Sequence, residues 1–206
     1  ETDRIQVHKY AVASNLPEVF ADAGQWMDSQ TFTLLQEMKE GGIEHAWIGL
    51  NSWEQAYGKP ELVETAVSQD YLIASYDSYH SIHEPGREQW ITAQFDDPAL
   101  YENAVITDQN GKPESGFQNV GRKLNPALSL PAVKNRMEGI MSSQLPFNSW
   151  FIDCDATGEI YDDYTPSHIT TQEEDLSARL ERMSYIRDQY HLVIGSEGGN
   201  DFAASD

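Results

Sequence analysis

Short apolar runs alternate with helical patterns along the chain, and most of the runs end in polar residues. The four clearest runs are residues 46–50, 71–76, 150–154 and 191–194. Continuous apolar runs of this length are typical of strands that are buried on both faces of a parallel sheet. The segments between them that show helical spacing or helix boundaries are 29–41, 61–68, 131–141 and 170–190. This alternation predicts an α/β fold with a parallel sheet.

Two of the apolar runs end in a carboxylic acid, and these two runs flank one predicted helix. Asp153 lies at the end of the run Trp150–Cys154, and Glu197 follows the last run. Between them, Thr170 and Glu173 have the spacing of a helix capping box. A strand–helix–strand unit makes parallel neighbours, so both acids are expected at the C-terminal edge of one sheet. Adjacent strands lie about 4.8 Å apart, which would bring the two carboxyl groups within reach of one substrate.

The remaining segments are less regular. Apolar residues within 5–12 predict a ragged first strand, and residues 85–125 form a long insertion between clear elements. Inside the insertion, residues 108–111 have the composition of a hairpin turn, and residues 117–120 are the expected returning strand. An insertion at the active edge of a sheet is expected to shape a substrate pocket.

Alternating helices and apolar strands with polar ends favour a (β/α) barrel of the TIM type. A complete eight-stranded barrel needs about 250 residues, whereas this chain has 206 residues, four clear strands and an irregular first one. We therefore expect residues 1–206 to form a single partial barrel domain, with the missing remainder of the barrel as its partner. A small open α/β sheet that is complete in itself is the alternative.

Charge and composition restrict the partners of the chain. Thirteen Lys and Arg against 34 Asp and Glu give a net charge of −21, which repels nucleic acids and anionic membranes and favours a neutral substrate. The single Cys154 excludes an internal disulfide. No apolar stretch approaches the roughly 20 residues of a membrane span, and no signal peptide is recognisable at the start. The acidic surface favours a secreted or periplasmic location, with any leader already removed.

Polar and aromatic side chains at the strand ends are the candidate substrate-binding residues. Those that follow the first two clear runs are Asn51, Trp53, Asp77, Tyr79, His80 and His83. Asp155 joins them, because residues 153 and 155 point the same way along a strand. For the same reason Asp155 is a rival for the catalytic position. Trp47 and Trp150 are expected in the core, since buried aromatic residues are more often packing than site residues.

Two acids at neighbouring strand ends suit glycoside hydrolysis. One carboxylic acid protonates the leaving oxygen and a carboxylate stabilises or captures the oxocarbenium-like carbon, so the two pKa values must differ. The strand end Phe151-Ile152-Asp153, together with Ile194–Gly199 on the next strand, resembles the catalytic barrel of glycoside hydrolase families 101 and 129, the α-N-acetylgalactosaminidase group. The resemblance implies a retaining glycosidase that acts on a carbohydrate substrate, with Asp153 as nucleophile and Glu197 as general acid/base.

Two other hypotheses stay open. One is a barrel that binds carbohydrate without cleaving it. The other is a metal-dependent hydrolase that uses His80, His83 and Asp155, because imidazoles with a carboxylate can hold zinc or iron. A calcium-loop pattern that starts at Asp153 fails at its twelfth position, Tyr164, where a bidentate Glu is required. We therefore expect no metal and no cofactor.

Overall fold

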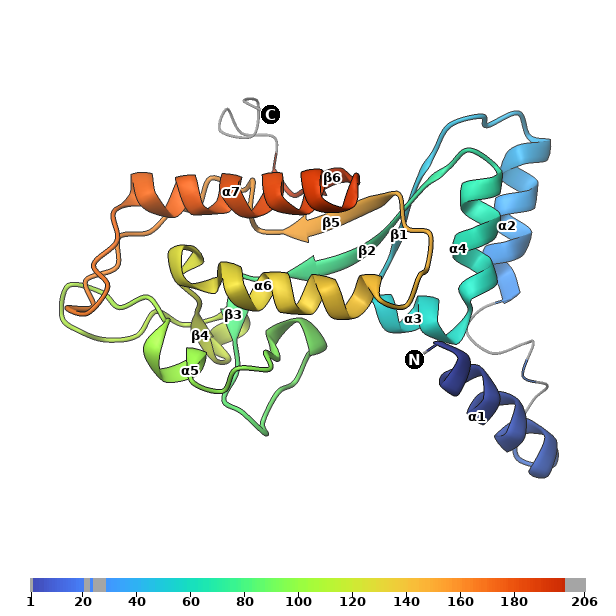
Figure 1. The fold of residues 1–206 in the computed structure, drawn as a ribbon, viewed down its shortest axis with the longest axis horizontal. Coiled ribbons are helices and arrows are strands. Elements are labelled where there is room, and N and C mark those ends of the chain that lie inside the picture. The colour runs from blue at the N-terminus through green and yellow to red at the C-terminus, as the bar shows by residue number, and fades with distance from the viewer. Residues whose placement is uncertain (1, 21–22, 24–28, 199–206) are drawn as a thin grey trace. The chain divides into compact units, whose positions relative to one another are not determined.

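A computed structural model describes residues 2–20, 23 and 29–198 of the chain (Figure 1). The helices are α1 (Thr2–Asn15), α2 (Ser29–Glu40), α3 (Trp53–Gly58), α4 (Pro60–Ser68), α5 (Leu100–Asn103), α6 (Pro126–Met141) and α7 (Gln172–Tyr190). The strands are β1 (Trp47–Leu50), β2 (Leu72–Ser78), β3 (Ser81–Ile82), β4 (Arg122–Lys123), β5 (Ser149–Asp153) and β6 (Val193–Ser196). Short 3₁₀ turns lie at Ile91–Ala93 and Phe117–Asn119.

The described strands form one larger sheet in the order β1-β2-β5-β6 and a separate antiparallel pair, β3 with β4. β1 and β2 are parallel, with Trp47 opposite Leu72 and Leu50 opposite Ser75. The arrows of β2 and β5 point the same way in Figure 1, and α7 connects β5 to its neighbour β6. The predicted α/β fold with a parallel sheet is therefore confirmed.

The chain divides into two compact units. The first comprises Glu1–Tyr76 with Ile140–Trp150, and the second comprises Asp77–Gly139 with Phe151–Asp206. The chain passes from one unit to the other within β2 and within β5. The two acids Asp153 and Glu197 both belong to the second unit.

In the first unit, helix α1 replaces the ragged strand that was predicted for residues 5–12, and that prediction is wrong. The apolar residues that suggested a strand are largely exposed: Val7 66%, Tyr10 49% and Val12 40%. Polar side chains hold the helix instead. Gln6 Nε2 donates to the carbonyls of Tyr57 and Gly58 at 2.9 Å, and Lys9 Nζ donates to the Gly58 carbonyl at 2.8 Å. These carbonyls end α3, where helical C=O groups lack partners within the helix.

Strand β1 is less buried than its apolar sequence predicts. Trp47 is 44% exposed, so its expected place in the core is wrong. β1 has one neighbour in the described sheet, and an edge strand exposes more of its residues than a central one. Trp150 of β5, in contrast, is fully buried as expected and meets the ring of Phe147 edge-on at 5.4 Å.

Helix α6 begins at Pro126, before the predicted start at Pro131. Oδ1 of Asn125 accepts the N–H of Ala127 at 2.9 Å, which is the contact of an N-cap residue. Pro131 lies inside the helix, where it cannot donate the hydrogen bond of an ordinary residue. The buried apolar residues of the helix include Val133, Met137 and Ile140.

Helix α7 has its capping box one residue later than predicted, and its buried face is mostly charged. The Thr171 side chain, not that of Thr170, accepts from the N–H of Glu174, whose carboxylate accepts from the N–H of Thr171. Leu180 and Met183 are half-buried and line a groove of about 460 Å³ beside β6. The buried positions of the helix are Asp175, Arg179, Arg182 and Ile186. Charged residues can occupy this face because each is paired there.

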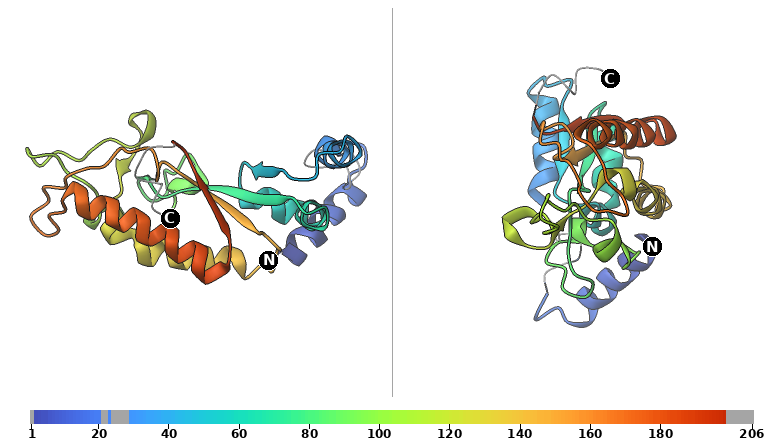
Figure 2. Two further views of the ribbon diagram at one scale, coloured as in Figure 1. Left: turned by 90° about the horizontal axis from the view of Figure 1, so that it is seen from above. Right: turned by 90° about the vertical axis from the view of Figure 1, so that its left-hand side faces the viewer.

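Within the second unit, α6 and α7 pack side by side, as both views of Figure 2 show. Arg182 of α7 donates through Nη1 to Ser129 Oγ of α6 at 3.2 Å. Lys134 Nζ lies 4.7 Å from the centroid of the Tyr185 ring. The two helices therefore support each other through a hydrogen bond and a cation–π contact.

The hairpin predicted within the insertion is confirmed at its turn, where the Asp108 N–H donates to the Lys112 carbonyl at 2.9 Å. The chain returns through residues 113–115, which have antiparallel bridges at both ends. The predicted returning strand over 117–120 is wrong, because Phe117–Asn119 is a 3₁₀ turn. Its first residue is 60% exposed, so the apolar pattern there does not reflect a packed strand.

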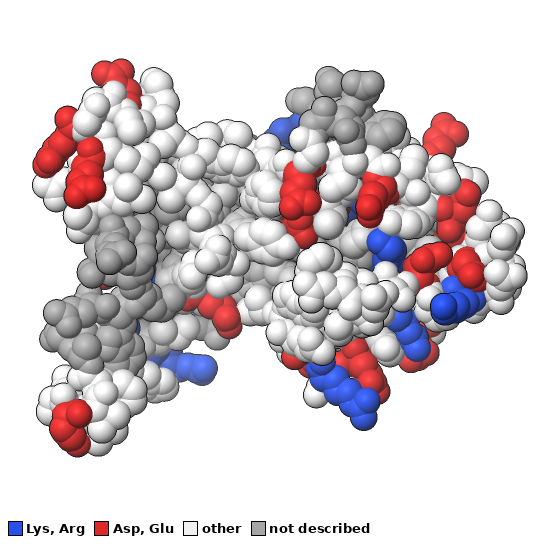
Figure 3. Space-filling view, turned by 180° about the vertical axis from the view of Figure 1, so that it is seen from behind, with Lys and Arg blue, Asp and Glu red and all other residues white. Residues whose placement is uncertain are grey.

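Acidic side chains are scattered over the face drawn in Figure 3 and do not gather in one block. This distribution agrees with a high net negative charge of −21 spread over the surface. In the part of the chain that the structure describes, no helix is both long and apolar enough to cross a membrane.

Asp163 joins the insertion to the segment before α7. Its Oδ1 accepts the N–H groups of Thr107 and Thr165 at 3.0 Å, and its Oδ2 accepts from Asn125 Nδ2 at 2.7 Å and lies 2.8 Å from His168 Nδ1. Burial raises the pKa of this carboxyl group, but the hydrogen bonds outweigh burial and hold the pKa below its ordinary value of 3.8.

We predict that Asp163→Asn lowers the free energy of unfolding by about 2 kcal/mol, because hydrogen bonds to a charged group are lost. Urea unfolding at pH 7 measures this loss. Since the folded pKa of Asp163 is depressed, its contribution is present above about pH 4 and disappears as the pH falls through the folded pKa. The variant and the parent should therefore converge in acid.

The matched control is Asp188→Asn, because Asp188 is an exposed carboxylate on α7. Its effect should stay within about 0.5 kcal/mol. Equal losses in the two variants would contradict the special role of Asp163.

Candidate active site

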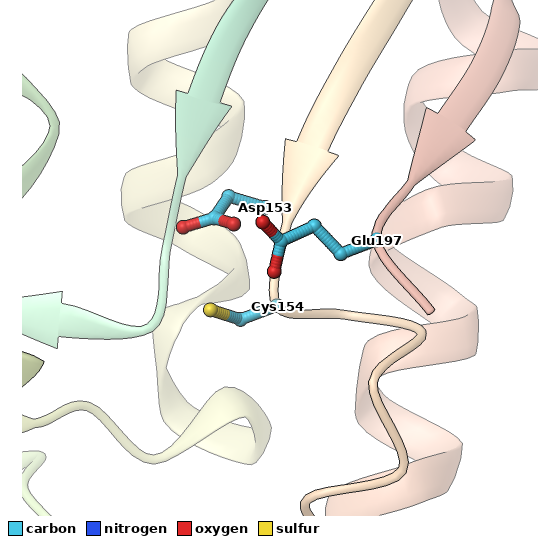
Figure 4. A group of neighbouring side chains, drawn as sticks. All are labelled: Asp153, Cys154 and Glu197. Carbon is cyan, nitrogen blue, oxygen red and sulfur yellow. The ribbon is translucent and has the colours of Figure 1, made fainter. Parts of the chain in front are cut away.

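Asp153, Cys154 and Glu197 come together at the C-terminal ends of β5 and β6 (Figure 4). A carboxylate oxygen of each acid and the Sγ atom of Cys154 all lie within 4.8 Å of one another. The arrows of β2, β5 and β6 point the same way in this view, so the two acids follow parallel strands. The structure thus brings Asp153 and Glu197 together at one edge of the sheet.

The chain turns sharply after β5 ends at Asp153. Cys154 has a φ of 66°, a left-handed conformation that costs a residue other than glycine about 1–2 kcal/mol. The strand alternation that placed residues 153 and 155 on one side therefore stops here. Asp155 is buried, and both of its oxygens accept from Arg182, with Nε 2.8 Å from Oδ2 and Nη2 on Oδ1. These contacts give both carboxylate oxygens of Asp155 a buried partner.

Two residues whose role the sequence does not reveal fix the end of β6. Ser196 Oγ donates to the Ile152 carbonyl at 2.5 Å and accepts the N–H of Ala156 at 3.1 Å. Gly198 has a φ of 100°, and a Cβ atom there would lie 2.3 Å from the Ala156 carbonyl oxygen. Glu197 lies between these two residues, so its backbone is held on both sides. No sequence pattern indicates such contacts unless the backbone path is known.

The two acids are electrostatically linked. The negative charge of Asp153 raises the pKa of Glu197, with a smaller contribution from burial. Burial, and after it the charge of Asp153, raises the pKa of the Cys154 thiol to about 12. Glu197 therefore keeps its proton to a higher pH than an isolated glutamate, which is what a general acid requires.

Asp153, Cys154 and Glu197 are also the one group of three metal-ligand side chains found within residues 2–20, 23 and 29–198. A thiol must lose its proton to bind a metal, and the raised pKa of Cys154 opposes that loss. His80 and His83 do not join any such group within the same residues. The metal-dependent hydrolase hypothesis therefore gains no support from the described side chains.

His80 is paired with a lysine that no sequence pattern indicates. Lys123 Nζ lies 2.8 Å from His80 Nε2 and 4.4 Å from the centroid of the Tyr161 ring. Burial, followed by the charge of Lys123, lowers the pKa of His80 to about 3, so its ring is neutral and Nε2 accepts from the lysine. Glu159 Oε2 lies 3.8 Å from the same lysine nitrogen. Basic and aromatic residues so far apart in sequence give no local motif.

His83 packs inside the insertion. Its Nδ1 accepts the N–H of Gln89 at 3.1 Å, and its ring meets the edge of Trp90 at 4.5 Å between centroids. Burial lowers the pKa of His83, which favours the neutral form that this packing needs. With 3% of its surface exposed, His83 is a packing residue and has little surface to offer a sugar.

Asp77 and Tyr79 are fully buried. Arg136 Nη1 donates to Asp77 Oδ1 at 2.8 Å, and the guanidinium carbons of Arg136 and Arg182 lie 5.4 and 5.3 Å from the centroid of the Tyr79 ring. Burial raises the pKa of Asp77, and the charge of Arg136 opposes that rise. Neither residue presents surface to a ligand in this structure, so both form part of a buried polar cluster.

Asn51 and Trp53 belong to the other compact unit. Trp53 is the first residue of α3 and is 7% exposed, so it packs in the core of that unit and is no open stacking platform. Asn51 is exposed, and its N–H donates to Gln55 Oε1 at 3.1 Å. Of these two candidates, Asn51 alone has a side chain that a ligand could reach.

A family model described as "Glycosyl hydrolases related to GH101 family, GH129" matches residues 37–206. The chain belongs to this family. The match includes both strand ends that carry Asp153 and Glu197, and the resemblance noted from the sequence is confirmed. A comparison with curated proteins gives no match.

Solved structures with a similar fold include α-N-acetylgalactosaminidase NagBb from Bifidobacterium bifidum. Its Gal-NHAc-DNJ complex has a TM-score of 0.68 and 19% identity, and the match covers 85% of this chain and 29% of that chain. Its GalNAc complex has the same TM-score and 18% identity, with coverages of 85% and 30%. The uncharacterized protein lmo2446 from Listeria monocytogenes EGD-e matches with a TM-score of 0.57 and 12% identity, over 85% and 20% of the two chains. The chain thus spans about three tenths of the NagBb chains.

We predict that Asp153→Asn lowers the pKa of Glu197 toward its ordinary value of 4.5, because the charge of Asp153 is the largest cause of the rise. A ¹³C NMR titration of the glutamate carboxyl groups measures this pKa, and Glu197→Gln identifies the resonance. Asp108→Asn, in the hairpin turn, is the control that should leave the titration unchanged. A pKa that stays raised in Asp153→Asn would show that burial is its main cause.

We also predict that Gly198→Ala and Gly139→Ala have opposite effects on stability. At Gly198 a Cβ atom meets the Ala156 carbonyl in a left-handed conformation, whereas at Gly139 in α6 it meets nothing within 4 Å. The first substitution should cost about 1–3 kcal/mol, and the second should be neutral or stabilise the helix by about 1 kcal/mol. Urea unfolding of both variants decides the matter, and a tolerated Gly198→Ala would mean that the end of β6 is not tightly held.

Proposed function

We propose that this chain carries the two catalytic carboxyl groups of a retaining glycoside hydrolase, with Asp153 as nucleophile and Glu197 as general acid/base. The approach of these two groups carries the proposal, because one oxygen of Asp153 lies within 4.8 Å of one oxygen of Glu197. Retaining enzymes hold their carboxyl groups about 5–5.5 Å apart, whereas inverting enzymes separate them by about 6.5–9.5 Å to admit a water. The close spacing supports double displacement.

In the first step, Glu197 gives its proton to the glycosidic oxygen while Asp153 attacks the anomeric carbon, which forms a glycosyl ester and releases the leaving group. In the second step, Glu197 takes a proton from the water that cleaves this ester. The charge of Asp153 raises the pKa of Glu197, and that charge disappears when the ester forms. The pKa of Glu197 then falls, which suits its change from acid to base.

The substrate we propose is a neutral glycan. The net charge of −21 disfavours anionic substrates. The structures of NagBb are those of an α-N-acetylgalactosaminidase, one of them with GalNAc bound. An α-linked N-acetylgalactosaminide is therefore the first substrate to test.

We further propose that β1, β2, β5 and β6 belong to a (β/α) barrel that includes strands outside residues 1–206. The support is the fold likeness, which extends over 85% of this chain but 29% of the longer NagBb chain. Active sites of such barrels lie at the C-terminal ends of the strands, which is where Asp153 and Glu197 lie.

We predict that Asp153→Asn and Glu197→Gln each lower the kcat of glycoside hydrolysis by about 100-fold or more. Aryl N-acetyl-α-galactosaminides with poor and good leaving groups provide the assay. Glu197→Gln should recover most of its first step with a dinitrophenyl leaving group, which departs without protonation, whereas Asp153→Asn should not. Glu181→Gln, an exposed acid on α7, should keep the full rate.

Other outcomes point elsewhere. We expect the first product to retain its configuration at the anomeric carbon, which ¹H NMR can measure. Inversion would mean that Asp153 acts as a general base and not as a nucleophile. Sugar binding without turnover in the unaltered chain would favour the carbohydrate-binding hypothesis, and loss of activity with a chelator would favour a metal-dependent one. Full activity in Asp153→Asn removes that residue from the mechanism.

A further inference from the structure

The second unit contains buried pairs of an arginine with an aspartate, and two of them touch the turn that follows Asp153. The pairs are Asp77–Arg136, Asp155–Arg182 and Asp175–Arg179, with side chains that are at most 9% exposed. Apolar residues of similar volume often give equal or greater stability than a buried ion pair. Stability alone therefore does not explain why arginines face the core here.

Arg179 holds the turn at its backbone. Its Nη1 donates to the Cys154 carbonyl at 3.0 Å, and its Nε donates to Asp175 Oδ1 at 2.6 Å. Cys154 adopts the left-handed conformation in this turn, which a residue with a side chain keeps only when its surroundings impose it. The guanidinium group of Arg179 thus links the peptide at Cys154, which has a left-handed conformation, to helix α7.

Arg182 holds the next residue of the turn. It donates to both oxygens of Asp155 through Nε and Nη2, and its Nη1 donates to Ser129 Oγ at 3.2 Å. A two-pronged arginine–carboxylate contact fixes orientation as well as distance. Asp155 is therefore tied to α7 directly and to α6 through the same guanidinium group.

The same helix leads into the strand that carries the second acid. α7 ends at Tyr190, and its C-cap residue His191 has a φ of 55°. β6 starts two residues later, with Glu197 just beyond it. Ser196 then bonds to both Ile152 and Ala156 on either side of the turn. One helix thus sets the position of both strand ends, and the two acids meet between them.

We propose that Arg179 and Arg182 are positioning residues that hold the Cys154–Asp155 turn and so keep the carboxyl group of Asp153 against that of Glu197. The catalytic consequence rests on the function proposed above, but the geometric claim does not. The two parts can therefore fail separately.

Cys154 is the one cysteine of the chain and reports on the turn. Its pKa of about 12 reflects burial and the nearby charge of Asp153, so a relaxed turn should bring the pKa down. The rate of alkylation by iodoacetamide as a function of pH measures this pKa in the folded protein. The ¹³C titration of Glu197 is a second measurement, since its raised pKa depends first on Asp153.

Replacing a whole pair avoids a buried charge without a partner. The test variants are Arg182→Met with Asp155→Leu, and Arg179→Met with Asp175→Leu. The matched control is Arg136→Met with Asp77→Leu, which also replaces a buried pair of the second unit but leaves the contacts of the turn in place. Arg179→Lys and Arg182→Lys keep the positive charge but lose the two-pronged hydrogen bonding of the guanidinium group. These variants are used if a paired replacement does not fold.

We predict that Arg179→Met with Asp175→Leu, and Arg182→Lys for the other pair, lower the pKa of Cys154 by one unit or more, which is a tenfold rise in thiolate at a fixed pH below it. Arg182→Met with Asp155→Leu is judged by the pKa of Glu197 alone, because the charge of Asp155 itself raises the pKa of Cys154. The pKa of Glu197 should fall toward 4.5 in the same variants. The control pair should change neither pKa, whatever it does to the melting temperature. On an active substrate, kcat should fall about tenfold or more while KM changes little, because the loss concerns the transition state.

Two results would overturn the proposal. If the pKa values of Cys154 and Glu197 stay unchanged in folded variants of Arg179 and Arg182, the turn keeps its conformation without the arginines. Equal changes in the test and control variants would mean that the arginines act only through general stability. If the unaltered chain hydrolyses no substrate, the proposed function fails, and the two titrations still decide whether the arginines position the acids.

Discussion

The site depends on holding two carboxyl groups together although their charges repel. Asp153 and Glu197 have oxygens within 4.8 Å, and the rise in the pKa of Glu197 reflects that repulsion. Such an approach persists only if the backbone on both sides is fixed. The left-handed turn at Cys154, the Ser196 bridge and the close contact of Gly198 with Ala156 supply that fixation.

Helix α7 explains why the support is polar. A helix that only covered a sheet would turn an apolar stripe toward it, but α7 turns Asp175, Arg179 and Arg182 toward the core. Apolar side chains cannot bond to a carbonyl or a carboxylate in the turn below, whereas a guanidinium group can reach both. The arginines thus contribute less apolar packing than leucines would, but they fix the direction of the Cys154 peptide group and of the Asp155 side chain.

Much of the fold follows from the sequence, because the strands buried in a parallel sheet are continuous apolar runs. The order of strand, helix and strand also places Asp153 and Glu197 at one sheet edge by a general rule of connection. Contacts decided by tertiary structure could not be predicted in this way. Lys123 reaches His80 across 43 positions, and α1 is held by Gln6 and Lys9 bonding to the end of α3, not by an apolar face.

The raised pKa of Glu197 also links the site to stability. A carboxyl group with a raised folded pKa stabilises the folded chain below its unfolded pKa, and this contribution is lost as the pH rises through the folded value. Near neutral pH the acid pair therefore works against folding, as functional sites commonly do. The same repulsion that weakens the fold keeps a proton on Glu197, so a neutral residue in place of Asp153 should raise the stability near neutral pH and let Glu197 ionise at a lower pH. The surrounding hydrogen bonds must then offset the unfavourable free energy of the acid pair. This explains why the hydrogen bonds to the turn are buried and why several of them hold the same turn.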